Sequence, residues 1–161
     1  MWLLYLLLSS CFYTTQVFAQ QAAADHYVTK MDFFGKHFSG ILTVKAIDSV
    51  QQRMVFTTET GFKFFDLKMT KDSVEVVDCI EPLRKKGILS VLTSDLNSLV
   101  YFPDAQVLKR KNIKNETQLT LKTKAGKVKQ RRNTAANHIT IKHSGLPIKY
   151  NFTKLIENET E

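Results

Sequence analysis

The feature that most constrains the fold of this chain is a single helical pattern with strand patterns on both sides of it. Between residues 82 and 100, apolar residues recur at the three- and four-residue steps that line one face of a helix: Leu83, Ile88, Val91, Leu92, Leu96 and Leu99. Proline is favoured at the first helical position, where its missing N–H is not needed, so the helix is expected to begin at Pro82. We therefore predict one principal helix inside a mainly β domain.

Short runs of β-branched and aromatic residues precede and follow this helix pattern. Four runs precede it, at residues 40–46, 53–58, 62–69 and 74–77, and five follow it, at 106–108, 118–122, 127–130, 138–142 and 148–152. The connections are short and polar, which favours antiparallel pairing of consecutive strands. A twisted sheet of about eight or nine strands tends to curl. The predicted class is α+β: an antiparallel curled sheet, or open half-barrel, with the helix on its concave face.

The parity of the first strands indicates which side chains face the helix in such a half-barrel. Alternate residues of a strand share a face, so one set of inward positions can be written down. Together with two residues of the helix, it forms a candidate apolar cavity lining: Leu42, Val44, Phe65, Leu67, Met69, Ile88 and Leu92. The same residues would also make an ordinary filled core, and the sequence leaves both alternatives open.

The first twenty residues predict export. They contain no charged side chain, and the apolar run at 2–13 is shorter than the roughly 20 residues needed to span a bilayer. This pattern is typical of a secretory signal at residues 1–19, with Val-Phe-Ala at 17–19 placing cleavage before Gln20. An alternative is a lipoprotein signal, because Leu-Ser-Ser at 8–10 precedes Cys11, whose lipidation would anchor the protein. Either route predicts a periplasmic or outer-membrane location.

The remainder predicts one domain, expected to be a monomer. Residues 20–37 are expected to form a lead-in that is either extended or a short helix, residues 38–157 the half-barrel, and residues 158–161 a tail. Removal of the signal leaves Cys79 as the single cysteine, so no internal disulfide can form. Cys79 follows a strand-like run and is expected to be a buried thiol that behaves as a small hydrophobe.

The second half of the chain is strongly basic. The whole sequence carries a net charge of +8, and residues 105–132 alone hold ten Lys or Arg against Glu116. Such a cluster is an electrostatic footprint for anionic partners. An exported protein meets anionic lipid headgroups, and no nucleic-acid motif is present, so anionic membrane is the expected partner and nucleic acid is not. The candidate residues are Lys122, Lys124, Lys127, Lys129, Arg131 and Arg132. A merely solubilising face is the alternative.

No catalytic or metal-binding constellation is recognisable. His138 and His143 are five residues apart in one strand region, which places them on opposite faces, so a metal pair is not expected. No nucleophile elbow, phosphate loop, Cys-x-x-Cys pair or His-Glu-x-x-His helix occurs. The sequence therefore predicts a protein without enzymatic activity, cofactor or metal.

Three short segments carry a family resemblance: Met-Val-Phe at 54–56, Glu-Thr-Gly-Phe-Lys-Phe-Phe-Asp at 59–66 and Glu-Pro-Leu at 81–83. With these, residues 38–100 resemble a group of small bacterial exported or lipoprotein-type proteins. The order of elements resembles the lipoprotein localisation factors, outer-membrane lipoprotein carriers in which a half-barrel encloses an apolar cavity. The resemblance implies a cell-envelope protein that binds an acyl chain, lipid or lipidated partner. The alternative is an envelope interaction or structural protein with a filled core, which docks on anionic surfaces through its basic face.

Overall fold

Ten antiparallel strands form one continuous sheet in the computed structural model, which describes residues 24–101 and 106–156. The strands are β1 (Ala24–Phe33), β2 (Lys36–Ala46), β3 (Gln52–Thr58), β4 (Lys63–Met69), β5 (Val74–Cys79), β6 (Val107–Ile113), β7 (Glu116–Thr123), β8 (Gly126–Asn133), β9 (His138–Ser144) and β10 (Ile148–Lys154). A short 3-10 helix, η1 (Glu81–Leu83), and the α-helix α1 (Lys86–Val100) lie between β5 and β6. The mainly β fold with one principal helix is as predicted.

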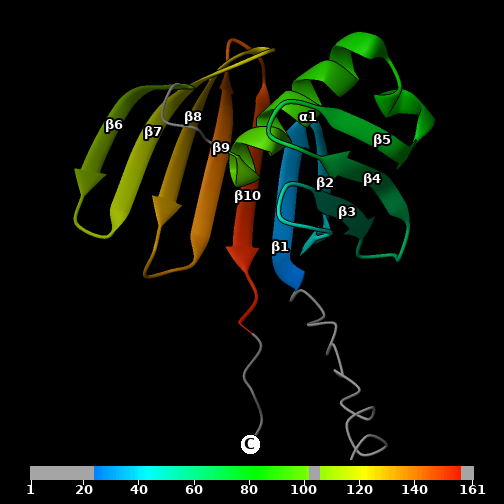
Figure 1. Ribbon diagram of the computed structural model, residues 1–161, viewed down its shortest axis with the longest axis horizontal. Helices are drawn as coiled ribbons and strands as arrows, with labels where there is room; N and C mark the ends of the chain where they lie inside the picture. Colours follow the sequence, from blue (N-terminus) through cyan, green and yellow to red (C-terminus); the bar gives the residue numbers. More distant parts are fainter. Residues whose placement is uncertain (1–23, 102–105, 157–161) are drawn as a thin grey trace, which may run out of the picture.

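The sheet consists of two five-stranded meanders joined side by side. The strand order is β5-β4-β3-β2-β1-β10-β9-β8-β7-β6, so the first and last strands of the chain pair at the centre (Figure 1). The two edges of the sheet are β5 and β6, which do not pair with each other, so the sheet is open. The chain must pass from one edge to the other between β5 and β6, and η1 and α1 make this crossing. The half-barrel curvature stays a prediction.

The predicted lead-in is wrong, because part of it forms strand β1. The sheet therefore has ten strands instead of the predicted eight or nine. Residues 24–33, expected to be extended or a short helix outside the sheet, are a central strand paired with both β2 and β10. Thr29, Met31 and Phe33 are buried, whereas the intervening Lys30 is exposed. The sheet domain therefore includes residues before Phe38. The predicted signal segment, Cys11 and the 158–161 tail lie outside the described residues.

The helix begins later than predicted. Pro82 lies in η1, where Leu83 N donates to Ile80 O at 3.0 Å and Arg84 N donates to Glu81 O at 3.0 Å. Proline fixes a backbone angle that suits this tight turn as well as an α-helix, so the proline signal marked η1 instead of the start of α1. The α-helix begins at Lys86 and ends at Val100, the predicted last residue.

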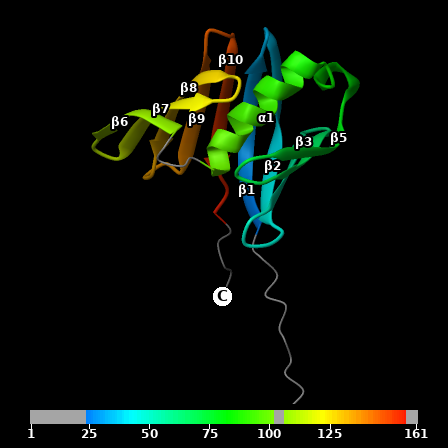
Figure 2. The same ribbon diagram turned by 45° about the horizontal axis from the view of Figure 1, so that its top comes forward.

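The core lies between α1 and one face of the sheet, which we call the inner face. Figure 2 shows α1 running across the sheet where the two meanders meet. Its buried apolar residues are Leu92, Leu96 and Leu99, three members of the predicted stripe. They join one cluster with buried side chains of both meanders, including Phe56, Leu67, Leu121, Ile141, Tyr150 and Phe152. The opposite face of the sheet is called the outer face below.

Gly40 in β2 marks a close approach of two strands and supplies a stability test. A Cβ atom at this position would overlap the Thr57 carbonyl oxygen and lie 2.7 Å from Thr58 Cα. Both are backbone atoms of β3 or its end, so no side-chain rotation relieves the clash. We expect Gly40→Ala to lower the free energy of unfolding by about 2–3 kcal/mol, the upper part of the usual range for overpacking. Urea unfolding followed by far-UV circular dichroism measures this loss.

Gly87 in α1 is the matched control for Gly40. A Cβ at Gly87 meets no atom within 4 Å, and alanine is favoured over glycine in a helix by up to about 1 kcal/mol. Gly87→Ala is therefore expected to leave the protein as stable or more stable. An equal loss in both variants would show that the contact with β3 is not the cause.

Candidate functional site

The most ligand-like feature of the structure is an apolar pocket at the end of the sheet where α1 begins. Its volume is about 320 Å³, at the lower end of the 300–1,000 Å³ typical of small-molecule sites. The turn between β1 and β2, the strand β4 and the segment from Ile80 to α1 surround it. We call it the end pocket; its lining residues are Phe33, Phe34, Lys36, Phe38, Phe64, Ile80, Pro82, Leu83, Lys85 and Ile88.

Aromatic rings form one wall of the end pocket. The rings of Phe38 and Phe64 lie 4.6 Å apart, and Phe64 also contacts the core ring of Phe56 at 5.8 Å. Phe33 and Phe34 meet edge to face at 5.2 Å. The wall is therefore continuous with the core, which holds the inner rings in place while the outer ones remain accessible.

Phe34 is held in an unusual backbone conformation beside this pocket. Its φ is 49° and that of Gly35 is 78°, as a two-residue hairpin turn of this hand requires. The left-handed region costs a non-glycine residue roughly 1–2 kcal/mol, and the turn leaves the Phe34 side chain 48% exposed. The turn therefore places an exposed aromatic ring at the rim of the end pocket.

The charged groups of the end pocket are all positive. Lys36 and Lys85 are exposed, and no carboxylate belongs to the lining. Neither ammonium group forms a hydrogen bond or an ion pair with any residue that the structure describes. An apolar wall with two uncompensated ammonium groups is complementary to an apolar chain that ends in an anionic group.

The residues predicted to line an apolar cavity are mostly buried in the core. Leu42, Phe65, Leu67 and Met69 are completely buried, and Val44 and Leu92 are nearly so. None of these six lines the end pocket, and only Ile88 of the predicted set does. These six belong to the buried cluster that α1 shares with the sheet. The accessible apolar space lies instead at the end of this core.

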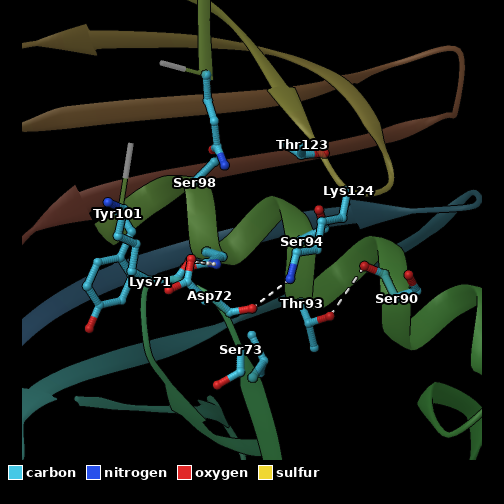
Figure 3. A pocket seen from close by; sticks show the side chains of 13 residues that line it. Lys71, Asp72, Ser73, Ser90, Thr93, Ser94, Ser98, Tyr101, Thr123 and Lys124 are labelled. Carbon is cyan, nitrogen blue, oxygen red and sulfur yellow. Dashed lines mark hydrogen bonds between the residues drawn. The ribbon is translucent and has the colours of Figure 1, made fainter. Parts of the chain in front are cut away.

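A second, polar hollow lies where α1 meets the β4–β5 and β7–β8 turns (Figure 3). Its volume is about 170 Å³. Lys124 Nζ donates to Asp72 O at 2.6 Å, and Ser94 Oγ accepts from Ala125 N at 3.2 Å. These bonds connect both turns to each other and to the helix. Because many of its polar groups are engaged in this way, we interpret the hollow as a joint that fixes α1 against both meanders.

The helix is also held by a buried carboxylate–imidazole pair that the sequence analysis missed. Asp95 of α1 is 0% exposed and His143 of β9 is 4% exposed, and the His143 Nδ1 to Asp95 Oδ1 distance is 3.1 Å. Burial raises the pKa of Asp95 to about 6, and the hydrogen bond and charge of His143 oppose this rise. The detectable signal was spacing, because Asp95 shares the helix face of Leu92 and Leu99.

This pair has no nucleophile beside it. The other ring nitrogen of His143 faces Gly126, and no hydroxyl group among the described residues hydrogen-bonds to it. Tyr150 lies nearby, and its burial, followed by the Asp95 charge, raises its pKa well above the usual value. A proton on Tyr150 is therefore held tightly at neutral pH. The arrangement joins α1 to β9 through two buried polar side chains.

The predicted anion-binding residues divide between two faces. Lys122, Lys127, Lys129 and Arg131 are exposed on the outer face. Arg132 lies on the inner side, half-buried, where its Nη2 donates to Leu99 O at 2.7 Å. Lys124 belongs to the polar hollow. The prediction grouped these residues by charge alone, whereas strand parity places Arg131 and Arg132 on opposite faces.

Comparison with known proteins identifies no family for this chain. No protein-family model matches the chain, and no curated protein matches it. Within the described ranges 24–101 and 106–156, no three His, Cys, Asp or Glu side chains are grouped so that they could hold a metal ion. No helix of these ranges is long and apolar enough to cross a membrane.

Proposed function

We propose that this protein is a non-enzymatic, exported cell-envelope protein that binds the acyl chain of an amphiphile in its end pocket. The observation that carries the proposal is the composition of that pocket: apolar and aromatic walls about a space of about 320 Å³, with Lys36 and Lys85 as the charged residues. The ligand class is a fatty acid, a phospholipid or the acyl group of a lipidated partner. The periplasm or outer membrane is the proposed location.

The energetics favour a chain ligand over a small polar one. Each buried methylene contributes about 0.8 kcal/mol, so several methylenes against the Phe38 and Phe64 rings supply several kcal/mol before the entropy of binding is subtracted. The two lysines then select among apolar ligands, because an anionic head placed beside them gains an attraction that a neutral head lacks. We also propose that the sheet curls around α1 as a half-barrel, so that the acyl chain of the ligand enters at the end where α1 begins.

Ile88→Glu is expected to lower the affinity for a fatty acid at least tenfold. Ile88 is half-buried in the pocket wall, so the substitution places a carboxylate where the acyl chain should lie without emptying the core. Fluorescence titration with an environment-sensitive fatty acid, together with mass spectrometry of lipids extracted from the purified protein, measures the loss. Val77→Glu is the matched control, since Val77 is an exposed apolar residue of β5 outside the pocket lining.

The same titration separates the contribution of the ligand's acyl chain from that of its anionic headgroup. A fatty acid is expected to bind more tightly than the fatty alcohol of equal length, and Lys36→Gln with Lys85→Gln should remove this difference. Equal affinities of the native protein for the fatty acid and the fatty alcohol would contradict recognition of an anionic head. They would not contradict the pocket as the site of the acyl chain. Unchanged fatty-acid binding in Ile88→Glu would contradict the pocket itself.

A further inference from the structure

The outer face of the sheet carries a second candidate site, which becomes visible in the distribution of charge. Residues 24–101 hold ten basic and ten acidic residues, whereas residues 106–156 hold thirteen basic residues and Glu116 as the single acid. The first range includes the whole first meander and the second range the whole second meander. One half of the sheet is therefore close to neutral, and the other carries nearly all of the excess positive charge.

Three cations of β3 and β4 in the first meander are paired with carboxylates beside them. Arg53 holds Asp66 through two bonds of 2.9 and 2.7 Å, and this contact lowers the pKa of Asp66. Lys63 Nζ lies 3.1 Å from Asp78 Oδ2, and Lys68 pairs with a neighbouring glutamate at 3.7 Å. This half of the sheet shows the interspersed signs that keep an ordinary protein surface soluble.

Six exposed cations of the second meander have no carboxylate partner among the described residues. We call the following six exposed residues the cationic face: Lys122, Lys127, Lys129, Arg131, Lys142 and Lys149. Register places them on one side of four adjacent strands, because directly opposed residues of antiparallel strands share a face. No side chain of the six forms a hydrogen bond or an ion pair with any residue in the described part of the chain.

On this face, the strand register places like charges directly opposite one another. Lys129 lies opposite Lys142, and Lys142 lies opposite Lys149, which makes a row of three lysines across β8, β9 and β10. Lys122 also lies opposite Lys127. Neighbouring strands are about 4.7–4.9 Å apart, and like charges in directly opposed positions destabilise a sheet. Solubility alone does not require this arrangement, whereas a partner of negative charge compensates it.

We propose that the cationic face docks on a bilayer surface rich in anionic lipids, independently of any ligand in the end pocket. The positive charges extend along the strands and across four of them, which suits a two-dimensional array of headgroups. Outer positions of β7 to β10 carry no Phe, Tyr or Trp on which nucleic-acid bases could stack. The helix lies on the inner face, so it is not available to enter a DNA groove.

Vesicle cosedimentation tests this proposal. The experiment uses the mature protein, purified after its host has processed it. Binding is expected to vesicles of phosphatidylcholine with about one third phosphatidylglycerol, and not to phosphatidylcholine alone, and to weaken as salt is added. Lys142→Glu should lower partitioning at least about fivefold, the equivalent of about 1 kcal/mol for one basic residue at an anionic surface. The same variant should raise the Tm by about 1–4 °C, because the new carboxylate lies between Lys129 and Lys149.

Lys86→Glu is the matched control. It changes the net charge equally, but Lys86 is an exposed residue of the first turn of α1, on the opposite side of the sheet. It should leave vesicle binding unchanged. Equal losses in both variants would mean that net charge alone drives binding and would overturn the proposal, as would undiminished binding of Lys142→Glu. Equal binding to neutral vesicles would overturn it too, and tighter binding to duplex DNA than to anionic vesicles at one salt concentration would assign the face to nucleic acid.

Discussion

Replacement of His143 by alanine is expected to lower the free energy of unfolding by about 3–5 kcal/mol. The substitution leaves the Asp95 carboxyl, which is completely buried, without the imidazole 3.1 Å away. Removal of one member of a buried pair costs this much because the remaining charge is shielded from water and keeps only the Tyr150 hydroxyl beside it. Urea unfolding at pH 7, followed by far-UV circular dichroism, measures the loss.

The pH dependence of stability provides an independent check on this pair. The pKa of Asp95 is raised from 3.8 to about 6 in the folded protein. Between these two values the folded state binds more protons than the unfolded state, so this group's contribution to stability falls as the pH rises from about 4 to about 6. The loss is at most about 3 kcal/mol, and Asp95→Asn should abolish it.

Asp95→Asn combined with His143→Ala completes the test. The double variant should be more stable than His143→Ala alone, because the amide does not carry the charge that makes the single substitution costly. A cost of under about 1 kcal/mol for His143→Ala, with no recovery in the double variant, would show that the pair contributes little to the attachment of α1.

Leu92→Ala should cost about 2–5 kcal/mol, the usual range for truncation of a buried leucine. Leu92 is 1% exposed and belongs to the cluster that joins α1 to the inner face of the sheet. Ser90→Ala is the control, because Ser90 is an exposed residue of the same helix, and a change within about 0.5 kcal/mol is expected there. A loss below about half a kcal/mol for Leu92→Ala, measured by urea unfolding, would place the helix on the surface.

Local patterns identified most elements, and they failed where a strand is interrupted by polar residues. The alternation in β7 to β10 and the apolar stripe of α1 are periodic signals, and both are present in the structure. Strand β1 carries His26, Lys30 and Asp32 among its apolar residues, which obscured its period. Its pairing with β10 joins residues more than a hundred positions apart, and no local pattern reports such a contact.

The candidate binding site could not be predicted from local patterns either, because it is formed by residues that are distant in the sequence. Leu42, Phe65 and Leu67 are buried, but whether residues of this kind enclose a cavity depends on how closely α1 approaches the sheet. The end pocket combines a hairpin turn, a residue of β4 and the start of the helix, three segments that meet only in the folded chain. Its two lysines have no distinguishing sequence context.

Composition by itself determined that the second half of this protein is strongly basic, and periodicity determined that its strands present one side to water. Only the tertiary structure decided which cations stand together. Strand register brought Lys142 and Lys149 beside Lys129, and the packing of α1 placed Leu99 O where Arg132 binds it. Residue type and spacing act within one strand, but the charge pattern of a face depends on the pairing of several strands, which the packing of the whole core sets.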